Sequence, residues 1–262
     1  MSLLGSDDPP PFELINANGR AKVLLVCDHA SNRIPIALDG LGMDAEALEQ
    51  HIAYDIGCRE VTRRLSESLD APAILAGYSR LVVDLNRSLT DPSLMPEVSD
   101  NTPVPGNQGL GQDDRSARIH ELFTPYRKAV DGVLHDFHQR GIAPAFIAIH
   151  SFTPRMNGFD RPWHIGVLWD KDPRIPVPLM AALRARPEGL TVGDNEPYSG
   201  KHPADYTIDH HAESRGIPHV SIEIRQDLID SDAGVARWAS ILEESLQEIL
   251  ADDALYAIWQ YV

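Results

Sequence analysis

Short apolar runs alternate with longer amphipathic stretches along most of the chain, and this alternation restricts the fold more than any other feature. Six apolar runs predict strands, at residues 21–28, 71–77, 80–86, 145–150, 163–170 and 219–225. Four amphipathic stretches predict helices, at residues 44–70, 114–141, 177–187 and 232–253. Strands that alternate with crossover helices form a sheet covered on both faces. We therefore expect an α/β three-layer sandwich with a central mixed, mostly parallel sheet.

The length and composition of the chain suit a single folded unit. The chain has 262 residues, 43% of them hydrophobic, which is enough to bury a sizeable core. We expect one domain over residues 13–262, preceded by a flexible lead-in at residues 1–12. That stretch lacks the basic region and apolar core of a secretion signal. Two cysteines are too few for a disulfide framework and indicate a reducing compartment, so we expect a cytoplasmic protein.

The charge and hydropathy of the chain exclude several classes of partner. The formal net charge is −16, which argues against a nucleic-acid groove or an anionic membrane surface as the main partner. No stretch approaches the ~18 consecutive apolar residues of a membrane span. A small anionic substrate stays compatible with this charge, because a few buried arginines can invert the field locally.

Polar side chains stand at the ends of four predicted strands, where a buried sheet does not require them. They are Asp28 and His29, Asn86 and Arg87, His150, and Glu223. If these strands are parallel neighbours, their carboxyl ends meet at one edge of the sheet, where α/β proteins bind ligands. We therefore expect these side chains to face one cleft.

These residue types match the composition of a catalytic metal site. Two imidazoles and a carboxylate, with a fourth position open, form a catalytic zinc site. The sequence thus predicts one divalent ion, zinc, bound by His29 and His150. Glu223 is the candidate general base for the attacking water. The planar guanidinium of Arg87 matches a carboxylate, so we expect Arg87, with Asn86, to bind an acidic substrate.

Several motifs resemble those of known metallohydrolases. The segment "VVDLNRS" resembles the Asn-Arg segment with which zinc carboxypeptidases hold a substrate carboxylate. The closer resemblance, over roughly residues 20–230, is to the N-formylglutamate amidohydrolase family, through "CDHASNRIP", "AYDIGC", "YSRLVVDLNR" and "YTIDHHAESRGIPHVSIEIRQDLI". It implies a zinc exopeptidase (phosphorylase/hydrolase-like) fold. It also implies a zinc-dependent amidohydrolase that removes a formyl-type acyl group from a small anionic N-acyl amino acid such as N-formylglutamate.

The third metal ligand is the point at which the chain departs from the carboxypeptidase pattern. Those enzymes have a glutamate three residues after the first histidine, and this chain has Asn32 there. The resemblance to related zinc aminopeptidases favours Asp55, in "YDIG". Asp28 is the second choice. Consecutive residues of an extended segment point to opposite sides, so Asp28 is expected to point away from the ligand His29. Asn32 is the third, since its neutral carbonyl would bind a metal weakly.

The resemblance also implies roles around the substrate. Tyr206 and His210 lie in "DYTIDHH", which lines the substrate side in that family, and either side chain can donate a hydrogen bond to an oxyanion. Arg80 is expected to add a second positive charge for substrate binding. The loop at 88–113 is long enough to close over the site. Three other histidines are expected in packing or on the surface: His202, His211 and His219.

Three alternatives to this function remain open. The same scaffold could serve a peptidase or a cell-wall amidase. The protein could also bind a metal without catalysing a reaction. In the third alternative, Cys27 beside His29 is the thiolate nucleophile of a cysteine-type amidase, although a cysteine at a strand end is more often a small buried hydrophobe.

Overall fold

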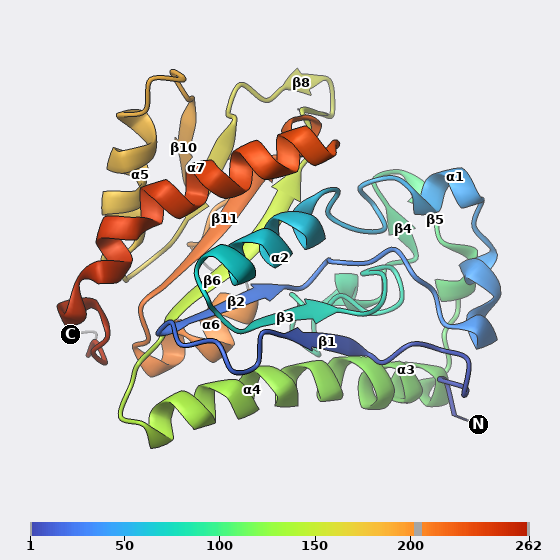
Figure 1. Ribbon diagram of the computed structural model, residues 1–262. Coiled ribbons are helices and arrows are strands. Elements are labelled where there is room, and N and C mark those ends of the chain that lie inside the picture. The colour runs from blue at the N-terminus through green and yellow to red at the C-terminus, as the bar shows by residue number, and fades with distance from the viewer. Residues whose placement is uncertain (1, 202–205, 261–262) are drawn as a thin grey trace.

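The computed structural model describes residues 2–201 and 206–260, and these form a three-layer α/β sandwich (Figure 1), as expected. The central sheet has seven strands in the order β1-β3-β2-β6-β11-β9-β10. Its strands are β1 (Phe12–Ile15), β2 (Val23–Cys27), β3 (Ala73–Ala76), β6 (Ala145–Phe152), β9 (Ile165–Leu168), β10 (Val192–Asp194) and β11 (His219–Arg225). The α-helices are α1 (Ala45–Leu48), α2 (Cys58–Ser68), α3 (Gln112–Arg118), α4 (Thr124–Gln139), α5 (Pro176–Arg184), α6 (Tyr206–His211) and α7 (Asp232–Ala251).

The middle of the sheet is parallel. Strands β3, β2, β6 and β11 run in one direction as neighbours. Strand β9 is antiparallel to β11, β10 is parallel to β9, and β1 is antiparallel to β3 at the other edge. Every residue of β2 and β6 is buried, which is the state of parallel strands covered on both faces. The carboxyl ends of β2, β6 and β11 therefore lie at one edge of the sheet.

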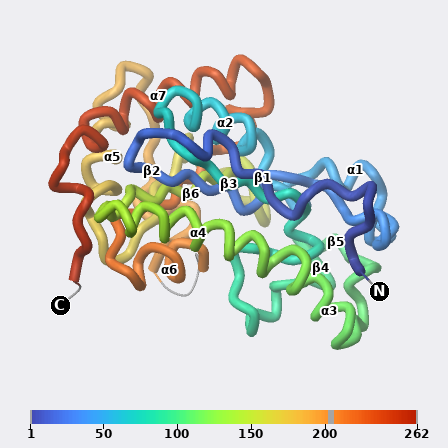
Figure 2. Tube along the Cα trace, turned by 60° about the horizontal axis from the view of Figure 1, so that its bottom comes forward, coloured from blue at the N-terminus to red at the C-terminus, as the bar shows by residue number. Residues whose placement is uncertain are grey.

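Helices cover both faces of this sheet. Helices α2 and α7 pack together on one face, with α5 against α7, while α4 and α6 lie on the other (Figures 1 and 2). The buried apolar side chains of both layers form one continuous cluster through the sheet. Within the described ranges, none of the helices combines the length and apolar character that crossing a membrane requires.

Two of the expected elements are wrong. Residues 80–86 form buried turns instead of a strand. Their carbonyls are satisfied by side chains, since Arg118 Nη1 donates to Val82 O at 3.0 Å and Asn107 Nδ2 donates to Leu81 O at 2.8 Å. The expected helix at 44–70 is divided into α1 and α2. Between them lies a turn that contains Gly57 with a φ of +79°, a conformation that a continuous helix does not allow.

Other parts of the chain are more ordered than the sequence indicated. The antiparallel strand β1, strand β10 and a small hairpin of β7 (Arg155–Met156) and β8 (Phe159–Asp160) were not predicted. The flexible lead-in at 1–12 stays a prediction. Within it, the backbone N–H groups of Leu3 and Leu4 donate to the Glu121 carboxylate at 2.7 and 3.0 Å. The expected loop at 88–113 is mostly irregular and contains the two-residue strands β4 (Val98–Ser99) and β5 (Thr102–Pro103).

Candidate metal centre and active-site cavity

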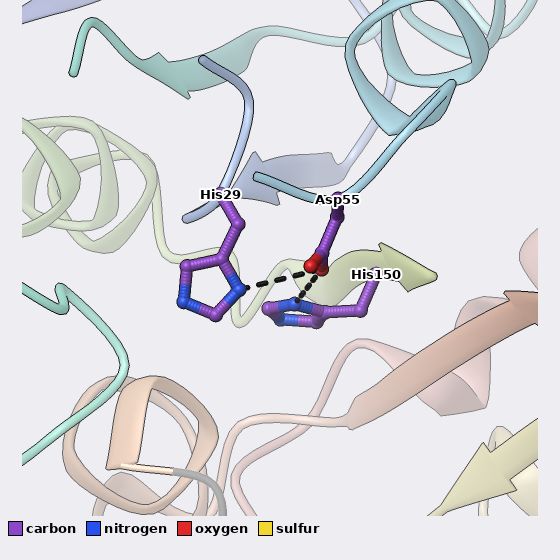
Figure 3. Close-up of side chains that lie close together, drawn as sticks. All are labelled: His29, Asp55 and His150. Atoms are coloured by element: carbon purple, nitrogen blue, oxygen red, sulfur yellow. Dashed lines mark hydrogen bonds and ion pairs between the residues drawn. The ribbon is translucent and has the colours of Figure 1, made fainter. Parts of the chain in front are cut away.

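Three buried side chains from separate parts of the chain meet at the edge of the sheet (Figure 3). The Nδ1 atom of His29 lies 3.3 Å from Asp55 Oδ2, and Nδ1 of His150 lies 3.0 Å from the same oxygen. One potential ligand atom from each residue lies within 4.8 Å of the other two. The residues that the sequence analysis assigned to the metal are therefore brought together by the fold, with Asp55 between the two imidazoles.

The topology of the sheet explains this meeting. His29 follows β2 by two residues, and His150 lies within β6, the parallel neighbour of β2. Asp55 arrives from the turn before α2, where its N–H donates to His29 O at 3.0 Å. A side chain at Gly57 would not fit there, because a Cβ would lie 2.1 Å from Ile229 O. The glycine thus allows the turn that brings Asp55 against the two histidines.

Two further carboxylates lie beside the Nε2 atoms of the two histidines. Asp84 Oδ1 lies 2.8 Å from His29 Nε2, and Asp28 Oδ2 lies 3.5 Å from His150 Nε2. The other oxygen of Asp28 accepts a hydrogen bond from the Tyr126 hydroxyl at 2.7 Å. Carboxylates in this position orient metal-binding imidazoles and raise their basicity. Asp28, the second choice as ligand, therefore lies near Nε2 of His150, whereas Asp55 lies near Nδ1 of the same ring.

Asn32, the third choice as ligand, points elsewhere. Its Nδ2 donates to Leu48 O and to Glu49 Oε1, both at 3.1 Å. Asp84 was noted in the sequence only as a polar residue at a predicted strand end and as a possible salt-bridge partner of Arg87. Its position in "DLNR" beside two expected substrate-binding residues was the available signal, but only the tertiary structure shows its contact with His29.

The electrostatics of the cluster suit a divalent cation. Burial opposes the charge of Asp55, but the neighbouring His29 and the hydrogen bonds from both imidazoles hold the pKa of Asp55 well below its usual range. Burial likewise opposes the charge of His150, yet the neighbouring carboxylates of Asp28 and Asp55 raise its pKa well above the usual value. Asp28, Asp55 and Asp84 bring three carboxylates to the cluster, and Arg80 is the guanidinium that pairs with two of them among the described residues. A cation at this cluster would therefore meet an excess of negative charge.

The donor geometry also fits such an ion. A tetrahedral zinc site with Zn–N and Zn–O bonds of about 2.0–2.1 Å has ligand atoms about 3.3 Å apart. The two distances from Asp55 Oδ2 to the imidazole nitrogens, 3.0 and 3.3 Å, are close to this spacing. Two imidazoles and one carboxylate leave a fourth position for water or substrate, as in catalytic rather than structural zinc sites.

A cavity of about 650 Å³ opens onto the cluster. His29, Asp55 and His150 line it, and so does Glu223, whose side chain is 7% exposed. Glu223 is paired with His150 in the register of β11 and β6, so the two side chains point to the same face of the sheet. The candidate base is therefore next to the candidate metal centre.

The expected substrate-binding residues 80, 86 and 87 line the same cavity. Arg80 is held by carboxylates, with Nη1 3.3 Å from Asp55 Oδ1 and Nη2 3.0 Å from Asp84 Oδ2. Arg87 donates to Asn86 O at 3.0 Å and to Ser93 Oγ at 3.2 Å, which are neutral acceptors. The Arg87 guanidinium can thus bind a substrate carboxylate without first losing an ion pair with a carboxylate of the protein.

Tyr206 and His210 lie apart from this group. Neither belongs to the described residues that line the cavity. The Tyr206 ring lies 4.6 Å from the Arg127 guanidinium carbon, and the His210 ring lies 4.9 Å from that of His211. His211 and His219 are buried, as packing residues are, whereas His202 lies outside the described residues.

The structure does not support a cysteine nucleophile. Cys27 is completely buried, and burial raises the pKa of its thiol to about 12, so the thiolate is not populated at neutral pH. The cavity residues that the sequence analysis did not single out include two with titratable side chains close to the proposed site. One is His51, whose pKa is lowered by burial to about 4. The other is Tyr198, which follows a strand that was itself not predicted.

Comparisons with known proteins give consistent results. The family model for the N-formylglutamate amidohydrolases matches residues 21–230. A gene product of Agrobacterium tumefaciens of known structure is 35% identical, with a TM-score of 0.91 over 95% of this chain and 98% of that chain. N-formylglutamate amidohydrolase from Ralstonia eutropha JMP134 is 20% identical, with a TM-score of 0.66 over 92% and 97% of the two chains, which shows a shared fold. A search of curated proteins found no match.

Proposed function

The chain belongs to the N-formylglutamate amidohydrolase family, and on that premise we propose that it is a metal-dependent hydrolase of small, acidic N-acyl amino acids. The proposed substrate class includes N-formylglutamate, with a formyl-type acyl group. The observation that supports this most is the position of Asp55 Oδ2, 3.3 and 3.0 Å from the two imidazoles, in a cavity that also contains Glu223.

His29, Asp55 and His150 are the proposed ligands of one divalent ion, with zinc as the expected metal. A divalent ion there supplies Lewis acidity, which makes water a stronger acid and polarises an acyl carbonyl. Asp84 and Asp28 orient the two imidazoles through their Nε2 atoms, so that each Nδ1 faces Asp55. These contacts prearrange the site before the substrate enters.

Glu223 is the proposed general base. Its carboxylate takes a proton from the attacking water and returns it to the amine that leaves when the amide bond breaks. Its place beside His150 in the register of the sheet supports this role. The surrounding cavity wall keeps Glu223 nearly buried, which limits exchange with bulk water.

Arg87 is the proposed anchor for the substrate carboxylate. Its guanidinium lines the cavity and contacts neutral oxygens only among the described residues. Asn86 assists from the same segment, and its own Oδ1 is held by the N–H of Thr207 at 2.8 Å. Because that bond uses the amide oxygen, the Nδ2 group of Asn86 is left as the donor to substrate.

The direct test is replacement of Glu223 by Gln with formate release from N-formylglutamate as the readout. Loss of the base is expected to lower kcat by at least ~10²-fold, with the metal content unchanged. Glu60→Gln, an exposed substitution on α2 with the same change of charge, is the matched control and should behave as wild type. Undiminished turnover in Glu223→Gln would remove Glu223 from the mechanism. Amino-acid release from peptides without deformylation would favour a peptidase instead.

A further inference from the structure

The loop at 195–200 brings Tyr198 into the cavity and is fixed against the sheet with little freedom. A Cβ at Gly166 or at Gly193 would lie 2.1 or 2.6 Å from Glu196 O, so the loop packs directly on the backbone of β9 and β10. Asn195 Oδ1 accepts hydrogen bonds from the N–H groups of Trp169 at 3.1 Å and Gly200 at 2.8 Å. Contacts at Glu196 and at Asn195 and Gly200 therefore hold the loop against β9 and β10.

A buried arginine holds the Tyr198 hydroxyl. Arg161 is 7% exposed, and its Nη1 lies 3.1 Å from the Tyr198 oxygen and 3.3 Å from both Thr153 O and Thr153 Oγ1. No carboxylate among the described residues forms an ion pair with Arg161, and the nearby Asp160 pairs with Arg155. A guanidinium can only donate hydrogen bonds. The Tyr198 oxygen is therefore the acceptor in this pair, and its own O–H is directed away from Arg161.

The O–H of Tyr198 has no acceptor within 2–201 and 206–260, while the residue lines the cavity together with Thr153 and Glu223. Burial and the Glu223 carboxylate raise the pKa of Tyr198, so the hydroxyl keeps its proton at neutral pH. Tyr198 is 36% exposed, so its O–H can donate to water or to a group that enters the cavity.

The sheet order indicates which group that is. Tyr198 comes from the loop after β10, on the Glu223 side of the sheet, because β9 pairs with both β10 and β11. Arg87 and Asn86 come from the segment after β3, on the other side of β2. A substrate whose carboxylate is bound by Arg87 would extend across the sheet toward Glu223, and Tyr198 lies on the far side of Glu223 from Arg87 in the strand order.

We propose that Tyr198 donates a hydrogen bond to the acyl oxygen as it becomes negative during hydrolysis, and that Arg161 positions Tyr198 for this. The proposal rests on the proposed function of the cavity. During the reaction the water oxygen bonds to the acyl carbon, the C=O π electrons move to the acyl oxygen, and Tyr198 stabilises that charge without transferring its proton. The C–N bond then breaks and Glu223 returns the water proton to the amine.

The first experiment compares Tyr198→Phe with wild type on the best substrate of an N-acyl amino acid panel. Removing one oxyanion donor is expected to lower kcat by ~10²–10³-fold with KM unchanged, because the bond forms only in the transition state. A second readout is binding to the metal-loaded protein. Tyr198→Phe should weaken binding of a tetrahedral phosphonate analogue of the substrate and leave binding of the product amino acid unchanged. A rise in KM with kcat intact would overturn the proposal.

The second experiment tests Arg161 through its dependence on Tyr198. Arg161→Met should lower kcat in the wild-type background and have no further effect in a Tyr198→Phe background, since coupled residues are not additive. Arg161→Lys, which keeps a donor, should retain part of the activity. Arg155→Met, on the same hairpin and 66% exposed, is the control. Equal losses from Arg161→Met in both backgrounds would contradict the positioning role. If the protein hydrolyses another member of the panel but not N-formylglutamate, the proposed substrate is wrong. The Tyr198 and Arg161 experiments can then be done with the substrate that is hydrolysed.

Discussion

Among single residues, Asp84 connects the proposed ligand His29 with the segment that is proposed to bind substrate. Asp84 accepts hydrogen bonds from Asn86 N at 2.9 Å and from Arg80 Nη2 at 3.0 Å, besides its contact with His29 Nε2. It therefore links the candidate metal centre to the segment that lines the substrate side. Asp84 thus contacts the proposed ligand His29, the backbone of Asn86 and the guanidinium of Arg80.

Asp84→Asn is expected to weaken metal binding by ~10–100-fold, because a neutral amide holds Nε2 of His29 less firmly than a carboxylate does. Competition with a chromophoric chelator measures this affinity. Asp160→Asn, an exposed change of the same type, should leave the affinity at the wild-type value. Equal affinities in wild type and Asp84→Asn would mean that His29 does not depend on Asp84.

The same substitution has a defined pH dependence in the metal-free protein. Burial opposes the charge of Asp84, but His29 and Arg80 hold its pKa well below the ordinary 3.8. A carboxyl group with a depressed folded pKa stabilises the fold above its unfolded pKa and loses this contribution as the pH falls toward the folded value. The difference in unfolding free energy between wild type and Asp84→Asn should thus be constant near neutral pH and shrink below about pH 4. Urea unfolding across this range measures it.

At the scale of elements, the candidate site is built where regular structure is interrupted. Asp55 lies in the turn between α1 and α2, and residues 80–87 are buried turns in a place where a strand was expected. Turns of this kind need backbone conformations that a strand or helix cannot supply, and Gly57 is the clearest example. The side chains with proposed roles therefore depend on a few tightly packed backbone positions.

Gly57→Ala is expected to lower the unfolding free energy by at least ~1–3 kcal/mol, because the added Cβ overlaps Ile229 O and the positive φ disfavours a side chain. It should also weaken metal binding, since Asp55 is two residues away. Gly132→Ala in α4 is the control, because a Cβ there has no atom within 4 Å and removing a helical glycine stabilises by ~0.5–1 kcal/mol. Denaturant unfolding of both variants tests this, and similar effects of the two would contradict it.

At the scale of the whole molecule, the sheet was largely predictable and its irregular parts were not. Strands β2 and β6 have nearly continuous apolar runs and β11 has apolar residues at alternate positions, so these strands and a mostly parallel sheet could be predicted from the sequence. The run at 80–86 also contains four apolar residues, but it forms turns in which the Asn107 and Arg118 side chains donate hydrogen bonds to the carbonyls of Leu81 and Val82. The hydrophobicity of a segment predicts that it is buried, but it does not predict which groups form hydrogen bonds with its backbone.

The candidate site, too, was predictable only in part. His29, His150 and Glu223 could be grouped in advance because the ends of parallel neighbours must meet at one edge of the sheet. Asp84, Asp28 and Tyr198 could not be assigned their contacts, since each depends on tertiary packing between segments far apart in the chain. The resemblance to the N-formylglutamate amidohydrolases was confirmed by the family match over residues 21–230. The roles of the individual residues stay predictions.

The central claim is that His29, Asp55 and His150 together bind one divalent ion. Isothermal titration of Zn²⁺ into the chelator-stripped chain tests it most directly, with Asp55→Ala and His150→Ala beside His210→Ala from the second His/Asp group of the described residues. The account predicts one tight site in wild type and His210→Ala, and its loss in Asp55→Ala and His150→Ala. Tight binding of one ion that persists in Asp55→Ala and His150→Ala would contradict it.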